Sequence, residues 1–175
     1  VMGKTVTTEF ACMDPSPTRN PWGNAHTPGG YSSGSAVGVA ARVFPAALGS
    51  QTAGSVLRPA SYNGVVGMKP TFGLISRHGV FPVAETLDTM GFFTRTVKDA
   101  AMVLAAMAGP DERDASTVRA ASVDYVKAVT TADGPPRIGV LRQMFADKAE
   151  AEVLRNTDTV VKLMADSGAT VEEVT

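Results

Sequence analysis

The sequence predicts an α/β fold, and three stretches of the chain carry this prediction. Residues 137–175 have the pattern of a strand, an amphipathic helix and a second strand. Residues 35–44 are small and apolar, as in a helix that packs closely on a sheet, and residues 96–108 have the clearest helix signals. A strand–helix–strand unit favours parallel pairing of its strands, with the helix against the sheet.

The first 30 residues are rich in Pro, Gly, Asn and Thr, which predicts an ordered loop. The small-residue helix over Ser35–Phe44 has Ser32 or Ser33 as its expected N-cap, and Pro45 is expected to end it. Ala46–Leu48 then leads into GSQTAGS, whose residue types are typical of turns.

Short strands are expected over Val65–Met68 and Gly73–Ser76, on either side of a Lys-Pro-Thr segment. The helix over Thr96–Ala108 begins with a capping-box pattern, and Gly109 followed by proline marks its end. Another helix is expected over Ser116–Thr130.

The C-terminal unit is the strongest argument for the α/β class. Arg137–Leu141 (RIGVL) is expected to be a buried strand, and Glu150–Ser167 an amphipathic helix. Ala169–Val174 follows a glycine and is expected to be the second strand.

The composition is that of an ordinary globular protein, with 44% apolar and 19% charged residues. The 16 Lys and Arg nearly balance the 17 Asp and Glu, so the charge does not point to nucleic acid or to an anionic membrane. One cysteine, Cys12, excludes an internal disulfide. No apolar run reaches membrane-spanning length, and we expect a cytoplasmic protein without a cofactor. Because Val1 begins inside sequence that looks structured, we expect these residues to be a segment of a longer polypeptide.

Histidine and carboxylate chemistry has little support. His26 and His78 are the two histidines, and neither has metal-ligand spacing, so no metal site is expected. A lone loop histidine is more often a surface residue than a catalytic base. Asp88, Asp99 and Asp111 lie in polar loops or at helix caps, where solvated or capping roles are the usual explanation.

Hydroxyl groups among glycines are the best candidates for chemistry. Small residues let the backbone turn sharply, so that successive N–H groups can hold the oxyanion of an acyl-transfer intermediate. Turns and a helix cap are the simpler explanation for such a segment. A P-loop lacks its Lys-Ser/Thr pair, and the GxSxG match at 30–34 has no strand before it. The hydroxyls in the two segments, GGYSSGSA and GSQTAGSV, are Ser32, Ser33, Ser35, Ser50, Thr52 and Ser55.

The stretch GGYSSGSAVGVAARVFPAALGSQTAGSVLRPASYNGVVGMKPTFGLISRHGV resembles the amidase signature family. The similarity extends from Gly3–Ala11 to Leu87–Leu104 and covers about the first 110 residues. The resemblance implies a mixed sheet sandwiched between helices, with residues 1–175 as part of one domain: a core motif over 1–110 and a strand–helix–strand unit over 137–175. It also implies amide hydrolysis by a Ser-cisSer-Lys triad.

In this resemblance the nucleophile is Ser55, the serine of a TGGS-type turn. The oxyanion hole is implied on the backbone N–H groups of the same turn, at Thr52, Ala53 and Gly54. Ala53 replaces the commoner glycine and keeps its N–H donor.

The proton relay departs from the family pattern. The position of the bridging serine is occupied by Tyr31, whose hydroxyl lies on a rigid ring far from the backbone. Either Ser32 substitutes for it, or the relay is damaged, and we favour damage. The family's catalytic lysine is expected upstream of Val1, because Lys4 and Lys69 match other, structural segments.

Arg58 and Gln51 match a subgroup of the family that includes enzymes of small carboxylate-bearing amides such as malonamate. The guanidinium of Arg58 suits the carboxylate of such a substrate and equally suits a structural ion pair. Gln51 is expected to support the loop.

Three functions therefore remain open. The first is an amidohydrolase with a small-molecule amide as its partner and a homodimer as the assembly to test. The second is a catalytically impaired or non-catalytic amidase fold, and the third is the amidase subunit of a tRNA-dependent amidotransferase.

Overall fold

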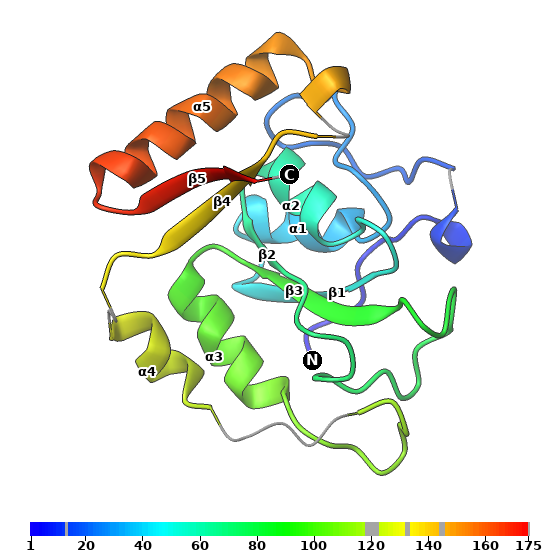
Figure 1. Ribbon diagram of the computed structural model, residues 1–175. Helices are drawn as coiled ribbons and strands as arrows, with labels where there is room; N and C mark the ends of the chain where they lie inside the picture. Colours follow the sequence, from blue (N-terminus) through cyan, green and yellow to red (C-terminus); the bar gives the residue numbers. More distant parts are fainter. Residues whose placement is uncertain (13, 118–122, 132–133, 144–145, 175) are drawn as a thin grey trace. The chain divides into compact units, whose positions relative to one another are not determined.

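The computed structural model describes residues 1–175 except Met13, 118–122, 132–133, 144–145 and Thr175. It divides into two compact units, Val1–Thr130 and Thr131–Thr175. The elements, labelled in Figure 1, are η1 (Glu9–Ala11), α1 (Ser33–Ala40), β1 (Ala46–Gln51), α2 (Leu57–Asn63), β2 (Val66–Met68), β3 (Thr89–Thr94), α3 (Val97–Met107), α4 (Tyr125–Thr130), β4 (Arg137–Leu141), η2 (Ala146–Lys148), α5 (Ala151–Asp166) and β5 (Thr170–Val174).

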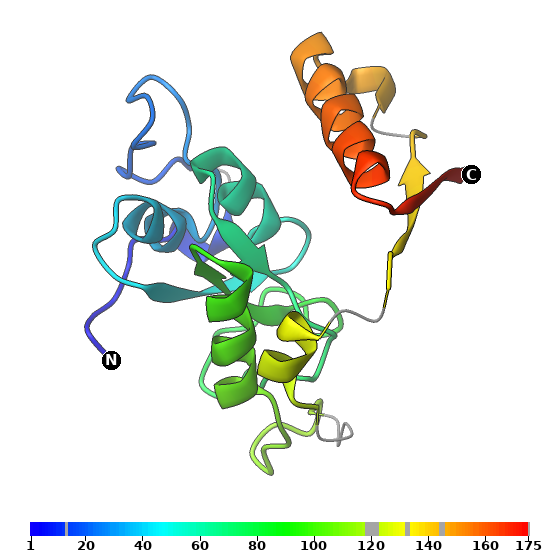
Figure 2. The ribbon, with the colours of Figure 1, turned by 90° about the vertical axis from the view of Figure 1, so that its left-hand side faces the viewer.

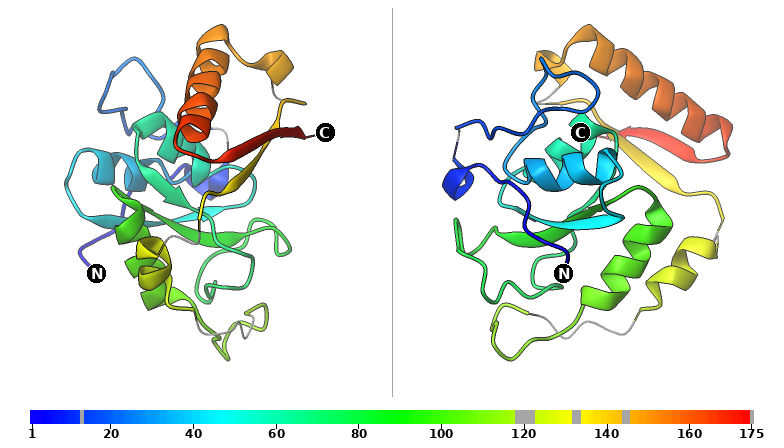
Figure 3. Two further views of the ribbon diagram at one scale, coloured as in Figure 1. Left: turned by 60° about the vertical axis from the view of Figure 1, so that its left-hand side comes forward. Right: turned by 180° about the vertical axis from the view of Figure 1, so that it is seen from behind.

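The first unit is a sheet with helices on both faces. Its three strands are antiparallel, and β3 lies between β1 and β2. Helices α1 and α2 contact each other and cover one face, while α3 covers the other (Figure 3). The fold class predicted from the sequence, a sheet between helices, is confirmed.

Two adjacent phenylalanines of β3 show why both faces are covered. Successive strand residues point to opposite faces, so Phe92 and Phe93 enter different layers, and both are fully buried. Burial of each side chain contributes about 2–3 kcal/mol of apolar transfer free energy. Phe93 packs with Ala36, Val39, Val56 and Ala60 from α1 and the α2 region, and Phe92 packs with Ile75, Ala100 and Leu104 from the α3 side.

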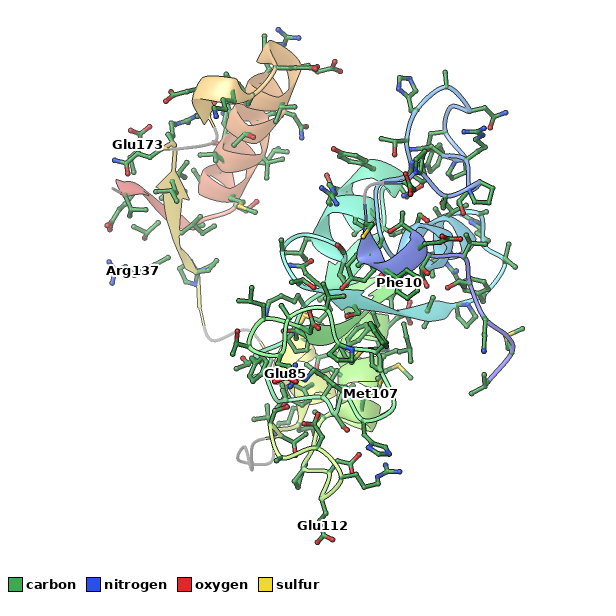
Figure 4. The ribbon with its side chains drawn as sticks, turned by 90° about the vertical axis from the view of Figure 1, so that its right-hand side faces the viewer. Phe10, Glu85, Met107, Glu112, Arg137 and Glu173 are labelled. Carbon is green, nitrogen blue, oxygen red and sulfur yellow. The ribbon has the colours of Figure 1, made fainter. Side chains whose placement is uncertain are left out.

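The second unit confirms the predicted strand–helix–strand pattern. Strands β4 and β5 are parallel, with Arg137 opposite Thr170, and α5 lies along them (Figure 2). The expectation that β4 is a buried strand is wrong, because within this unit a helix covers only one face and Val140 alone is buried. Arg137 and Glu173 are exposed on β4 and β5 (Figure 4). No described helix has the length and apolar character needed to cross a membrane.

The small-residue helix ends earlier than predicted, at Ala40 rather than before Pro45. Arg42 takes a left-handed conformation with φ of 60°, and the chain turns back. Phe44 then packs against Gly38, where any side chain would collide with the phenyl ring. The N–H of Val43 donates to the carbonyl of Gly38 at 2.9 Å and that of Arg42 to the carbonyl of Val39 at 3.2 Å, and this backbone closure around the left-handed Arg42 ends the helix.

Three further expectations need correction. Gly73–Ser76 is a turn and not a strand, because Gly73 has φ of 76° and the chain bends there. GSQ in GSQTAGS belongs to β1, so only the second half of that stretch is a turn. Of the helix expected over Ser116–Thr130, only α4 is helical, residues 118–122 lie outside the described residues, and Ser116 belongs to a turn on Asp114.

The other helix signals hold. The hydroxyl of Thr96 accepts a hydrogen bond from the N–H of Asp99 at 3.0 Å and caps α3, which ends at Met107 before Gly109. In residues 1–30, the described part contains only the short η1, as its composition predicts.

Candidate active site

The turn between β1 and α2 presents Ser55. Strand β1 ends at Gln51 and α2 begins at Leu57, so the five residues between them connect the sheet edge to a helix. Ser55 is buried, with 6% of its surface exposed. In the described part of the chain its hydroxyl forms no hydrogen bond.

Gln51 shapes this turn. Its Oε1 accepts hydrogen bonds from the N–H of Val56 at 2.8 Å and of Leu57 at 2.9 Å. One buried side chain therefore satisfies two donors at the start of α2, which would otherwise lack partners. The sequence-based expectation that Gln51 supports the loop agrees with this geometry.

The N–H groups of the turn that precede Val56 have no such acceptor within the part of the chain that the structure describes. Among the described residues, none of the N–H groups of Thr52, Ala53, Gly54 and Ser55 donates a hydrogen bond within the chain. The carbonyl of Gly54 accepts from the N–H of Arg58 at 2.8 Å, which begins the helical pattern. The donors left over belong to the same turn as Ser55, and backbone N–H groups of this kind can stabilise a negative oxygen.

Tyr31 reaches the same turn from the N-terminal side of α1. Its hydroxyl lies 3.2 Å from Ser50 Oγ and 3.2 Å from Thr52 Oγ1. The Gly30–Tyr31 peptide bond is cis. No hydrogen bond joins Tyr31 to Ser55 among the described residues, so the two are brought near the same turn without direct contact of this kind.

Ser32 holds α1 to β1. It is 2% exposed and occupies the N-cap position of α1, yet its hydroxyl does not cap the helix as predicted. It instead accepts a hydrogen bond from the N–H of Ser50 at 3.2 Å, because the helix start lies against the strand. Ser33 and Ser35 likewise bond Ser16 Oγ and Leu48 O. Ser32 and Ser35 thus join α1 to β1, and Ser33 joins α1 to the N-terminal loop.

Asp88 is a site residue that sequence reasoning misses. It is not solvated as expected but 5% exposed, and its Oδ1 accepts the hydroxyl of Thr52. Its Oδ2 accepts the N–H groups of Val83 at 2.7 Å and Ala84 at 2.9 Å. Burial raises the pKa of Asp88, but these hydrogen bonds and the charge of Arg77 outweigh it, so the pKa lies below its ordinary value. Its only sequence signal is its place in the segment resembling the family.

Arg58 lies in the first turns of α2 and is exposed. Its Nη2 donates to the carbonyl of Gly30 at 3.0 Å, and no ion pair of Arg58 is present among the described residues. The side chain lines a cavity of about 430 Å³ together with Arg19, His26 and Tyr31. The guanidinium of Arg58 therefore keeps N–H donors that other described residues do not use, and the side chain of Arg19 is a second cation in the lining of the same cavity.

The family comparison adds to this geometry. The model of the Amidase family matches residues 1–175. The chain belongs to the amidase family. It is 42% identical over 180 residues to a glutamyl-tRNA(Gln) amidotransferase subunit from Gloeobacter violaceus, covering 99% of this chain and 37% of the relative.

Solved structures of amidase relatives have the same fold. The crystal structure of a glutamyl-tRNA(Gln) amidotransferase subunit from Thermotoga maritima matches with a TM-score of 0.90 and 41% identity, over 98% of this chain and 39% of that one. The structure of 6-aminohexanoate cyclic dimer hydrolase complexed with substrate matches with a TM-score of 0.88 and 32% identity, over 98% and 38%. The chain thus spans between 37% and 39% of the length of these relatives.

Other candidate groups of this amidase chain lie apart from the turn. His26 and His78 are exposed, and neither side chain bonds Ser55 in the described structure. Lys69 Nζ donates to the carbonyl of Pro70 at 2.7 Å, in keeping with the structural role expected for it. Among the described residues, no group of three or more His, Cys, Asp or Glu side chains is arranged to hold a metal ion.

Proposed function

We propose that this chain carries the nucleophile of an amide-hydrolysing enzyme, with Ser55 as that nucleophile. The supporting observation is the combination of a Ser55 side chain that is only 6% exposed, whose hydroxyl has no hydrogen-bond partner, and unused N–H groups at Thr52, Ala53 and Gly54, within the described residues. A nucleophile and an oxyanion site on one turn are what acyl transfer requires.

The reaction proceeds in two balanced steps. Ser55 Oγ bonds to the amide carbon, its proton passes to a base, and the carbonyl electron pair moves to the oxygen held by the turn. Collapse breaks the C–N bond, and the leaving nitrogen takes the proton. Water then adds to the acyl ester, releasing the carboxylic acid and restoring the hydroxyl. We expect the base to be a lysine that acts through a hydroxyl at the position of Tyr31 or Ser32.

The substrate class that we propose is a small amide bearing a carboxylate. Arg58 lines the 430 Å³ cavity with Arg19, so two cations are available to a carboxylate there. Arg58→Lys removes the planar fork and is expected to raise KM for such an amide about tenfold or more, since hydrogen bonds to charged groups contribute about 1.5–3 kcal/mol. An uncharged amide of the same length is the control, and an equal rise in its KM would assign Arg58 to structure.

A second candidate function is the amidase subunit of a tRNA-dependent amidotransferase. It is favoured by the identity of 42% to a relative named as a glutamyl-tRNA(Gln) amidotransferase subunit. In that case the released nitrogen is passed to an acceptor with the help of partner subunits. Dependence of amide cleavage on added partner subunits and charged tRNA distinguishes this function from a free-standing amidohydrolase.

A third candidate is a catalytically impaired amidase fold, because Tyr31 occupies the bridging position. Tyr31→Ser tests it in the polypeptide as encoded, including any residues that precede Val1. A damaged enzyme is expected to gain activity on restoration of the serine, whereas a fold retained for binding is not.

Labelling by an active-site-directed fluorophosphonate tests the main proposal in the same polypeptide. We expect the phosphonyl group on Ser55, located by peptide mass spectrometry, and no labelling in Ser55→Ala. Ser61→Ala, which changes an exposed serine on α2, is the matched control and should label like the wild type. Modification of other serines only, in a folded protein, would contradict the proposal.

A further inference from the structure

Four polar side chains form a continuous series of hydrogen bonds beside the Ser55 turn. The series runs from Ser50 Oγ to Tyr31 Oη at 3.2 Å, from Tyr31 to Thr52 Oγ1 at 3.2 Å, and from Thr52 to Asp88 Oδ1 at 2.5 Å. Tyr31 and Asp88 come from segments more than 50 positions apart in the sequence. Only the folded sheet brings them to one place.

The direction of these hydrogen bonds is set at Asp88. Both of its carboxylate oxygens are occupied, Oδ1 by Thr52 and Oδ2 by the N–H groups of Val83 and Ala84. An ionised carboxylate only accepts, so the hydroxyl of Thr52 must donate to it. The oxygen of Thr52 then accepts from Tyr31, whose oxygen in turn accepts from Ser50. Each hydroxyl in the series therefore has one orientation.

We propose that Asp88 is a positioning residue, which acts through Thr52 to orient the Tyr31 hydroxyl and to hold the first residue of the Ser55 turn. Its link to catalysis rests on the proposed function, since Thr52 opens the turn that carries the expected oxyanion donors. A misplacement of about 1 Å in such a turn can cost on the order of a hundredfold in rate. The tyrosine that replaces the bridging serine is therefore an ordered part of the site.

Asp88→Asn is expected to reverse the direction of the hydrogen bonds in the series while keeping a side chain of the same shape. The N–H groups of Val83 and Ala84 require an acceptor, so the amide oxygen takes that side and the NH₂ group faces Thr52. The Thr52 hydroxyl loses its acceptor at Asp88, and the Tyr31 oxygen is the acceptor that the series still offers it, so we expect Thr52 to donate to Tyr31 and Tyr31 to Ser50. Thr52→Val removes the central hydroxyl while keeping the shape of the side chain, and Thr52→Ser keeps the hydroxyl.

The first readout is independent of catalysis. In the polypeptide as encoded, with ¹³Cζ-labelled tyrosine, the Tyr31 resonance is assigned by its loss in Tyr31→Phe. We expect Asp88→Asn and Thr52→Val to shift this resonance, because the ring oxygen changes its hydrogen-bond role, and Thr52→Ser to return it toward the wild-type position. Asp114→Asn is the matched control, since Asp114 also holds backbone N–H groups but is not part of the series of hydroxyls.

The second readout is the rate of fluorophosphonate labelling at Ser55. We expect Asp88→Asn and Thr52→Val to slow it about tenfold, Thr52→Ser to recover most of the rate, and the double variant to be no slower than the slower single one. An unmoved Tyr31 resonance overturns the proposal, and so does a moved resonance with an unchanged labelling rate. A wild type that is not labelled at Ser55 refutes the proposed function, while the resonance still decides whether Asp88 orients Tyr31.

Discussion

Replacing Gln51 by leucine tests how the Ser55 turn is held. The change removes the oxygen that accepts from the N–H groups of Val56 and Leu57, at nearly constant side-chain volume. Val56 is fully buried, so its N–H loses its partner away from water, which costs about 1–3 kcal/mol. Leu57 is about half exposed, so its N–H can reach water at a cost of about 1 kcal/mol. We therefore expect a loss of about 2–4 kcal/mol, a large part of the 5–15 kcal/mol typical of a folded domain.

Urea unfolding followed by tryptophan fluorescence measures this loss. Trp22 is the single tryptophan, and its Nε1 donates to the carbonyl of Asn63 at the end of α2, so its signal reports on that helix. Gln51→Glu is the matched control, because it keeps an acceptor for both N–H groups and places negative charge at a helix start. We expect it to lose less than half as much. A free energy of unfolding for Gln51→Leu within about 0.5 kcal/mol of the wild type would refute the capping argument.

Three further predictions concern the first unit. Phe93→Ala should lower the free energy of unfolding by about 3–5 kcal/mol in urea titrations, because the ring is fully buried against α1 and α2. Thr96→Ala should cost about 0.5–2 kcal/mol through loss of the α3 cap, measured in the same way, with Thr96→Ser close to the wild type. Hydrogen bonds from Ser116 and Arg77 hold the pKa of Asp114 below its ordinary 3.8. This stabilisation is complete above pH 3.8 and is lost as the pH falls through the lower folded pKa of Asp114. Asp114→Asn should therefore be less stable than the wild type at pH 7. As the pH is lowered from 7, the urea midpoint of the variant should fall less steeply than that of the wild type. Urea midpoints of the wild type and Asp114→Asn that fall in parallel with pH would contradict a stabilising role of the ionised Asp114.

Local patterns carry the parts of the fold that the sequence predicts. The cap at Thr96 and the glycine after α3 lie within a few residues of the helix that they bound, so their signals are readable in order along the chain. The same holds for the strand–helix–strand unit over residues 137–175, whose apolar periodicity is local. Ser55 is identified in another way, from a long stretch that resembles a family.

The tertiary structure decided the strand pairing, the burial of Asp88 and the contacts between hydroxyls, because each depends on segments far apart in the sequence. Strand β1 contains a Gly-Ser-Gln run that favours a turn, yet it pairs with β3 about 40 residues later, and that pairing overrides local propensity. Asp88 has the sequence context of a loop carboxylate, yet it is buried where the paired strands β1 and β3 bring it beside Thr52. The sequence by itself determined the residue types and pointed to the turn that we propose as the carrier of the nucleophile. Only the fold decided which hydroxyls meet, because hydrogen bonds between side chains 19 to 36 positions apart have no local signature.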